Sequence, residues 1–439
     1  MSSQSSKNDV AWESLFAERD ILGDVDRNGV HLITAEAINK RREARLMTKF
    51  DHIVNLPETF AKNGLSILPN SRTSYVIGRF DCYQRLSAQQ EEPEIIEWAF
   101  PDWIQSLSPS DLYSESSALL CAQHAGLLAD VLDDETIALT VFGRMSTGTF
   151  DFSIQEQGRE QGGATSPRIL TVDRAQCEID GAFEGMDSFA IVEVKNEEVN
   201  DFHIRQLYYP YRLWSNKMSK PVVPVFLTYS NEVFSFSVYD FTRPDDYNSL
   251  ELVKRKRYQI AATEIEVSDI RRLLAQKKVV PEPLETDIPF PQADRFERVI
   301  DLLSRLHVAN GNLAQEDITT DYAFDNRQTQ YYTNAGRYLG LVERKKASGQ
   351  GVSYELTLLG RQIMSKPPQA RNLDLVELIL SHSVFRKAVE YYLSHAAPPP
   401  VEAILGFMRD AELPMNDTTA TRRAQSVLGW ARWMMSLTA

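Results

Sequence analysis

Three side chains in the stretch EIDGAFEGMDSFAIVEVKN, residues 178–196, have the types and spacing needed for phosphate chemistry: Asp180, Glu193 and Lys195. Two carboxylates held close together among apolar residues repel each other, so at least one would retain a proton. A divalent cation between them removes that cost, and Mg²⁺ needs only one or two protein carboxylates because it keeps several waters. Asp180, Glu193 and the backbone carbonyl of Val194 are therefore candidate Mg²⁺ ligands, with Mn²⁺ as a substitute. Such an ion acidifies a water molecule and polarises a phosphate. Lys195 could position the attacking oxygen or offset phosphate charge, and it could act as a base if a metal depressed its pKa.

The apolar runs that carry these residues predict an antiparallel hairpin with a short polar connection around Gly185–Ser188. A turn centred on Met186 and Asp187 places Asp180 opposite Glu193, and Glu178 opposite Lys195. Opposed residues have Cβ atoms about 4.5–5.5 Å apart, which is metal-bridging distance. Because side chains alternate between the two faces of a strand, one face is expected to be core and the other to carry the charges. The expected core face holds Ile179, Gly181, Phe183, Ala190, Val192 and Val194. Glu178 and Glu184 are alternative carboxylates if the register differs, and an ordinary Glu178–Lys195 ion pair on a solvated sheet is the non-catalytic interpretation.

The neighbouring elements must hold the hairpin in place. A helix is expected at 114–132 and a strand at 148–154 before it. A helix at 200–217, followed by the strand-like runs PVVPVFLTYS and VFSFSVYDF, is expected after it. Pro210 should kink the second helix or confine it to its first turn. The cluster KRKR at 254–257 could meet phosphate or form a solvated edge of the sheet.

This order of elements, over about residues 106–262, resembles the PD-(D/E)xK nuclease superfamily, which includes most restriction endonucleases. The matching residues are Asp180, the Glu193-Val194-Lys195 triplet, Gln206 and Glu115, whereas Ile179 replaces the proline of the motif. The resemblance implies an α/β core, a mixed sheet flanked by helices, and Mg²⁺-dependent hydrolysis of DNA phosphodiesters. Glu115 would hold a metal water or a second ion, or merely favour the helix dipole. Gln206 would orient the water or Lys195, or be a surface residue.

A second region, at residues 291–368, resembles a winged helix-turn-helix DNA-binding domain. DRFERVIDLLSRL has helical apolar spacing, two further helices follow, and ERKKASGQGVSYELT predicts a β-hairpin with a Gly-containing tip. In that comparison NRQTQYYTNAGRYLG is the recognition helix, since Arg pairs with guanine edges and Gln or Asn with adenine edges. The wing would place basic residues near phosphates, although winged helices also serve protein contacts or dimerisation. The candidate DNA-binding residues are Arg327, Gln328, Gln330, Tyr331, Asn334, Arg337, Arg344, Lys345 and Lys346.

The remaining chain is divided by composition. Residues 1–105 are expected to form an N-terminal α/β region that could contact DNA, 106–278 the nuclease-like core, and 279–290 a Pro-rich linker. Residues 369–439 are expected to be a C-terminal helical region. Its last helix carries Arg422 and Arg423 near its start, where a phosphate could bind, and Trp430 and Trp433 further along, which are expected to be core.

Composition is that of a globular chain, with 439 residues, 43% hydrophobic content and a net charge of −14. The acidic excess lies before residue 291, so a basic DNA-binding surface remains compatible with it. Three separated cysteines exclude a disulfide framework or zinc cluster. No run is long enough to span a membrane and no signal peptide opens the chain, which predicts a cytoplasmic protein. The absence of a G-x-x-x-x-G-K-[ST] motif argues against ATP use.

Together these features predict a type II restriction-type endonuclease that cuts double-stranded DNA as a homodimer, because one motif serves one strand. A cognate methyltransferase acting on the same site is the expected companion. A repair or mobile-element nuclease on the same core, and an inactive winged-helix DNA-binding regulator, are the alternatives.

Overall fold

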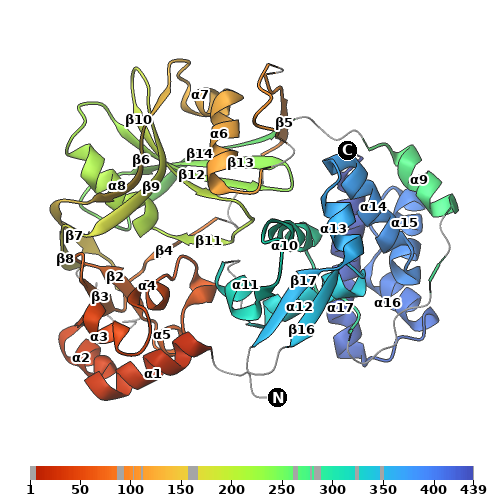
Figure 1. Cartoon of the computed structure of the whole chain (residues 1–439), viewed down its shortest axis with the longest axis horizontal. Coiled ribbons are helices and arrows are strands. Elements are labelled where there is room, and N and C mark those ends of the chain that lie inside the picture. Colours follow the sequence, from red (N-terminus) through yellow and green to blue (C-terminus); the bar gives the residue numbers. More distant parts are fainter. Residues whose placement is uncertain are drawn as a thin grey trace. The chain divides into compact units, whose positions relative to one another are not determined.

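A computed structural model describes residues 6–86, 93–101, 103–109, 112–156, 167–260, 265–276, 279–280, 288–321, 326–346 and 351–438. The chain forms two compact units (Figure 1). The first comprises Met1–Ser108, Ser114–Tyr229 and Val233–Ile260, and the second comprises Pro109–Tyr113, Ser230–Glu232 and Ala261–Ala439. The sequence-predicted linker at 279–290 lies largely outside the described residues.

The first unit is built around a seven-stranded mixed sheet with the order β5-β14-β13-β12-β10-β9-β6. Strands β6, β9 and β10 pair antiparallel, whereas β10 and β12 pair parallel, as do β14 and β5. A parallel pair needs a crossover, and the helix α8 (Arg205–Ser215) provides it between β10 and β12. The strands are β5 (Ile95–Trp98), β6 (Ala138–Ser146), β9 (Gln176–Glu184), β10 (Phe189–Lys195), β12 (Val222–Ser230), β13 (Val233–Phe241) and β14 (Leu250–Ile260).

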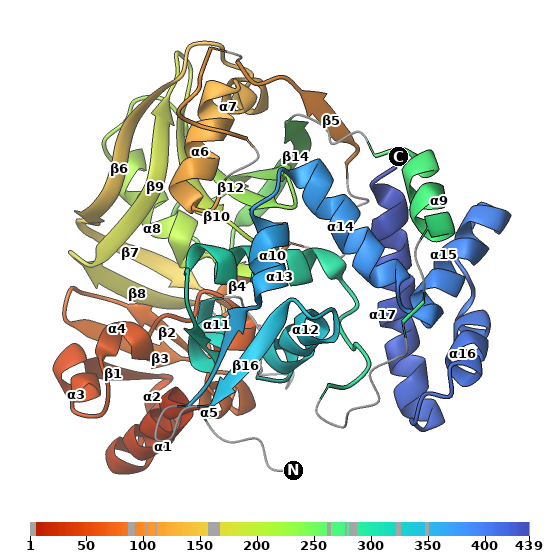
Figure 2. The same ribbon diagram turned by 45° about the vertical axis from the view of Figure 1, so that its right-hand side comes forward.

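Helices cover both faces of this sheet, which fits the mixed α/β class expected from the sequence (Figure 2). On one face, α6 (Glu115–His124) packs closely at Gly181, where an added Cβ would lie 2.6 Å from Leu119 Cδ2. On the other face, Phe189 packs against Trp214 of α8, with ring centroids 4.8 Å apart. Strand β10 is consequently apolar on both sides, as is usual for a strand buried in the middle of a sheet.

The N-terminal part of the first unit has its own core. The three-stranded sheet β1-β3-β2 packs with short helices around Trp12 and Phe60, whose rings meet edge to face at 4.8 Å. Two further two-stranded sheets, β4 with β11 and β7 with β8, lie outside the large sheet. The elements are α1 (Lys7–Arg19), α2 (Ile21–Asn28), β1 (Val30–Thr34), α3 (Ala35–Asn39), α4 (Ala44–Met47), η1 (Ile53–Asn55), α5 (Glu58–Lys62), β2 (Ser66–Pro69), β3 (Ser74–Gly78), β4 (Tyr83–Arg85), α7 (Leu127–Leu132), β7 (Thr149–Ile154), β8 (Arg168–Asp173) and β11 (Asp201–His203).

In the second unit, three helices and a small sheet follow the helix at Val267–Gln276. A helix, a short strand, two helices and a β-hairpin follow one another, and the sheet order is β15-β17-β16. An added Cβ at Gly336 would lie 2.6 Å from Val342 Cγ2, so the glycine lets helix α12 approach strand β16 closely. These elements are α10 (Phe296–Val308), β15 (Leu313–Ala314), α11 (Gln315–Asp321), α12 (Asn326–Tyr338), β16 (Val342–Lys346), β17 (Val352–Leu356) and α13 (Leu358–Met364).

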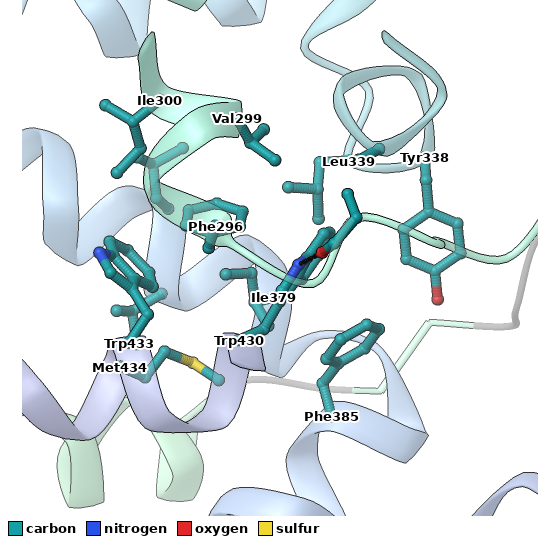
Figure 3. Packing of buried hydrophobic residues seen from close by; sticks show 14 of the residues in the cluster. Phe296, Val299, Ile300, Tyr338, Leu339, Ile379, Phe385, Trp430, Trp433 and Met434 are labelled. Carbon is teal, nitrogen blue, oxygen red and sulfur yellow. Dashed lines mark hydrogen bonds between the residues drawn. The ribbon is translucent and has the colours of Figure 1, made fainter. Parts of the chain in front are cut away.

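The C-terminal helices share one hydrophobic core with these elements (Figure 3). Trp430 and Trp433 both pack against Phe296 of α10, and the indole N–H of Trp430 donates to the carbonyl of Ala293 at 2.6 Å. The expectation that both tryptophans are core residues is thus confirmed. The helices are α9 (Val267–Gln276), α14 (Pro368–Leu380), α15 (Ser383–His395), α16 (Val401–Asp410) and α17 (Asp417–Ser436).

Two predicted helices differ in the structure. The helix expected at 200–217 begins only at Arg205, because Asp201–His203 pairs as β11 with β4. Pro210 does not confine it to a first turn, since five residues of α8 follow the proline. The helix expected at 114–132 is divided at Gly126, whose φ of 80° ends regular α-helix. No helix in the described part of the chain is long and apolar enough to cross a membrane.

Candidate active site

The predicted hairpin register is confirmed where β9 and β10 pair. Phe189 lies opposite Glu184, and the ladder continues to Val192 opposite Gly181. There the backbone pairing stops, so Asp180 and Glu193 are not a ladder pair. The side chain of Asp180 takes over instead, and its Oδ2 accepts a hydrogen bond of 2.8 Å from the Val194 N–H. The two strands therefore separate at the point where the charged residues begin.

Two expectations for β9 were wrong. Glu178 does not face Lys195 but lies opposite Arg144 of β6, and the two form an exposed ion pair of 3.1 Å. The β6–β9 register shifts between Val141 and Gly143, and Ile179 consequently packs in the same cluster as Ala182 and not with Gly181. On β9 the irregularity falls between Ile179 and Ala182 and so includes Asp180 itself, which is a common use of a β-bulge beside a site.

Four elements bring the predicted site residues together. Lys195 Nζ lies 2.6 Å from Glu193 Oε1 on β10 and 3.7 Å from Glu115 Oε1, at the start of α6. The amide of Gln206 on the first turn of α8 also donates to Glu193 Oε1. Asp180 joins the group through the hydrogen bond that it accepts from the backbone N–H of Val194. Lys195 and Glu193 are almost buried, with 12% and 11% of their side chains exposed, whereas Glu115 is 47% exposed and forms the open side.

Burial dominates the electrostatics of the two carboxyls. It raises the pKa of Asp180 to about 6 and the pKa of Glu193 to about 8, although the charge of Lys195 opposes both rises. Burial acts to lower the pKa of Lys195, but the surrounding carboxylates outweigh it and raise that pKa above its ordinary value. In this arrangement Lys195 is an ammonium ion at neutral pH, so it can position and neutralise oxygen atoms but cannot accept a proton.

The residues fit a divalent cation in their chemistry. Two carboxyls with raised pKa values and one carbonyl are oxygen donors that gain from a positive charge. In addition, Gln206 Oε1 is buried and has no hydrogen-bond partner among the described residues. Within those residues no three acidic, His or Cys side chains are grouped so as to hold a metal ion, and Glu193 is hydrogen bonded to Lys195 and Gln206. Metal binding would thus require Glu193 to exchange these partners.

One acid near the cluster was not found from the sequence. Asp51 lies between α4 and η1, and 16% of its side chain is exposed. Its Oδ1 is 3.7 Å from the guanidinium of Arg205, which precedes Gln206. Burial would raise the pKa of Asp51, but Lys195 and Arg205 outweigh burial and lower it. No spacing rule links Asp51 to the motif, because 129 positions separate it from Asp180.

The predicted DNA-reading residues lie on the less buried side of α12. Arg327 and Gln330 are exposed, and Gln328, Tyr331, Asn334 and Arg337 are partly exposed. The residues between them, including Thr329 and Thr333, are buried. Arg337 donates a hydrogen bond of 2.9 Å to Asn334 Oδ1, so these two side chains orient each other.

The basic side chains outside α12 differ in how strongly they are already paired. Arg344 and Lys346 are exposed on β16, whereas Lys345 between them forms ion pairs with Glu343 and Glu355 at 2.7 and 3.0 Å. Arg422 is exposed on α17. Arg423 is partly buried, and burial lowers its pKa.

Strand β5 pairs with β14 only from Arg257 to Ile260, so Lys254, Arg255 and Lys256 of the KRKR cluster lie beyond the end of β5. Lys254 and Lys256 are paired with Asp133 and Asp130, which ties β14 to α7 and its C-terminal end.

Comparison with known proteins gives three partial matches. Residues 78–259 match the family described as Domain of unknown function (DUF6997), residues 298–439 match Domain of unknown function (DUF7226), and residues 9–77 match Domain of unknown function (DUF6996). No curated protein and no solved structure matches the chain. Glu115, Asp180, Glu193, Lys195 and Gln206 all fall in the first match, and Asp51 falls in the third.

Proposed function

We propose that the protein is a Mg²⁺-dependent, sequence-specific endonuclease of restriction type that hydrolyses phosphodiester bonds in double-stranded DNA. One observation carries the proposal. Lys195 and Glu193 meet at 2.6 Å at the end of β10, beside Asp180 and Gln206, where the strands β9 and β10 separate. The meander of β6, β9 and β10, the crossover helix α8 and the parallel strand β12 support the proposed resemblance to the PD-(D/E)xK superfamily.

Each residue has a definite task in this proposal. Asp180 and Glu193 hold the ion together with the carbonyl of Val194. When bound, the ion supplies polarisation of the phosphate and a lowered pKa for water. Gln206, released from Glu193, orients the attacking water. Lys195 remains an ammonium and neutralises charge that develops on the phosphate, which is the type of preorganised electrostatic stabilisation that gives large rate effects. Glu115 accepts hydrogen bonds from water molecules at the open side of the site.

In this proposal, helix α12 recognises the DNA sequence. The order α10, β15, α11, α12 and the β16–β17 hairpin supports the resemblance to a winged helix, in which α12 enters the major groove and the hairpin is the wing. Arg327 and Gln330 are the exposed candidates for base contacts, and Arg344 and Lys346 are the candidates for phosphate contacts. A homodimer and a methyltransferase of the same specificity belong to the same proposal, since the described residues of one chain offer one site of this kind.

The test is digestion of unmethylated phage-length DNA with Mg²⁺ or with chelator by the wild type, Lys195→Ala and Lys220→Ala. Lys220 is the matched control because it also pairs with a glutamate, Glu184 at 3.0 Å, in the same unit. The proposal predicts discrete Mg²⁺-dependent fragments from the wild type and Lys220→Ala, and a rate at least about 10²-fold lower from Lys195→Ala. DNA that is bound but never cut would instead favour the regulator, and nicks without sequence preference would favour a repair nuclease.

A further inference from the structure

The loop that carries Asp51 is fastened to the segment leading into the candidate site. The backbone carbonyl of Asp51 accepts a hydrogen bond of 2.9 Å from the N–H of His203 on β11. The next two residues hold the opposite end of that strand, because His52 Nδ1 lies 2.5 Å from the Asp201 carbonyl and the Ile53 N–H donates to Asp201 Oδ1 at 2.9 Å. Strand β11 ends one residue before Ile204, which caps α8, so the loop sets where α8 begins.

A second anchor on the same loop comes from β4. The hydroxyl of Tyr83 donates to the carbonyl of Phe50 at 2.8 Å, and β4 pairs with β11 along its whole length. Phe50 is 2% exposed and belongs to the N-terminal core. The backbone of residues 50–53 is consequently held by hydrogen bonds on both sides, and the Asp51 side chain projects from a fixed position.

The Asp51 carboxylate faces cations of the site. Arg205, the first residue of α8, is 3.7 Å away, and Lys49 Nζ is 3.9 Å from the other carboxylate oxygen. Lys195 and Asp51 also interact, and each favours the charged form of the other. Three further titratable groups, His52, Tyr83 and His203, lie near Asp51, and His52 points to Asp201 at 3.8 Å. Arg205 and Lys195 therefore have a carboxylate partner that lies outside the motif.

We infer that Asp51, supplied by the N-terminal region, is a positioning residue of the candidate active site. Its carboxylate holds Arg205 and so the first turn of α8, which aims Gln206 at Glu193, and it attracts the Lys195 ammonium. When Glu193 gives up its contact with Lys195, Asp51 and Glu115 keep Lys195 in place. The inference rests on the proposed function for its effect on catalysis, whereas the positioning itself is independent of that function.

The first experiment needs no activity. Spectra of the ¹⁵N-labelled lysine ammonium groups are compared for the metal-free wild type, Asp51→Asn and Asp26→Asn, with the Lys195 signal assigned by Lys195→Arg. Asp26 is the control, because it is also an acid of the N-terminal region. It forms its ion pair, of 2.7 Å, with Arg79 instead of with Arg205. The inference predicts a shifted or broadened Lys195 signal in Asp51→Asn alone. An unchanged Lys195 signal in Asp51→Asn overturns it.

The second experiment measures DNA cleavage and binding by the same variants and by Asp51→Glu. Misplacement of a catalytic group by about 1 Å costs up to about 10²-fold in rate. We therefore expect Asp51→Asn to lower kcat by about 10- to 100-fold with KM and metal-free DNA binding unchanged, and Asp51→Glu to recover part of the loss. Equal kcat values for Asp51→Asn and the wild type overturn the catalytic part. A wild type that cuts no DNA, combined with a displaced Lys195 signal, refutes the proposed function but leaves the positioning role standing.

Discussion

Replacement of Glu193 by glutamine should make the metal-free protein more stable at neutral pH, and the pH dependence of this gain can be worked out. Glu193 is a buried carboxyl whose pKa rises from 4.5 to about 8 on folding. Between these two values the folded state holds a proton that the unfolded state has released. The free energy of unfolding of the wild type therefore falls as pH rises, by about 1.4 kcal/mol per pH unit from this group. The glutamine amide of the Glu193→Gln variant does not titrate, so the slope disappears in the variant.

Other groups of the cluster do not cancel this difference. Lys195 is protonated in both the folded and the unfolded state throughout this range, since its pKa is raised above an ordinary value of 10.5. Its contribution is therefore independent of pH. Asp180, whose pKa rises from 3.8 to about 6, adds a similar downward slope at lower pH in both proteins. Between pH 5.5 and 7.5 the variant should gain roughly 2–3 kcal/mol relative to the wild type.

The assay is urea unfolding of both proteins in chelator at pH 5.5, 6.5 and 7.5, with transitions of the two units separated by probes in each. Glu178→Gln is the control, because Glu178 lies on the neighbouring strand, is 56% exposed and pairs with Arg144. The Glu178→Gln variant should show the same dependence of unfolding free energy on pH as the wild type. Parallel pH slopes for Glu193→Gln and the wild type would refute the account of a buried, proton-retaining Glu193.

Three further outcomes test the packing and the proposed DNA contacts. Gly181→Ala should lower the free energy of unfolding of the first unit by about 1–3 kcal/mol through overpacking, and a loss below about 0.5 kcal/mol in urea unfolding would speak against the close packing of α6. Trp430→Phe leaves the buried Ala293 carbonyl without its hydrogen-bond donor and should lower the free energy of unfolding of the second unit by about 1–3 kcal/mol. An unchanged urea midpoint of that unit would contradict this prediction. Arg344→Ala should reduce the slope of log DNA affinity against log salt concentration, measured in gel shifts, by about one unit. Lys345→Ala should have a smaller effect, because two glutamates already pair with Lys345. Equal effects of the two substitutions would contradict this prediction.

The sequence predicted those features that depend on short-range periodicity. The hairpin register from Gly181 to Val192 and the two strands after α8 follow from apolar alternation and turn residues. The placement of Glu115 and Gln206 beside the Glu193–Lys195 pair was expected from the resemblance alone. It depends on crossover geometry, which no local pattern encodes.

The missed features depend on contacts distant in sequence. Glu178 does not oppose Lys195 because the β9–β10 ladder ends at Gly181 and Val192. The register irregularity in β6–β9 moves Ile179 to the other face, because one extra residue reverses the alternation of side chains beyond it. Residues 201–203 form a strand only because β4, more than a hundred positions earlier, pairs with them. Asp51 reaches the site through that same pairing, and a lone aspartate between short helices gives no signal of it.

The most direct test of the central claim is the single-turnover rate of cleavage of a one-site DNA duplex as a function of Mg²⁺ concentration, for the wild type and Asp180→Asn. Asparagine keeps an oxygen that can accept from the Val194 N–H but removes the charge that would hold the ion. The account predicts a rate that saturates with Mg²⁺ in the wild type and falls by at least about 10²-fold in the variant, with DNA binding in chelator unchanged. Equal rates for the two proteins at every Mg²⁺ concentration would contradict it.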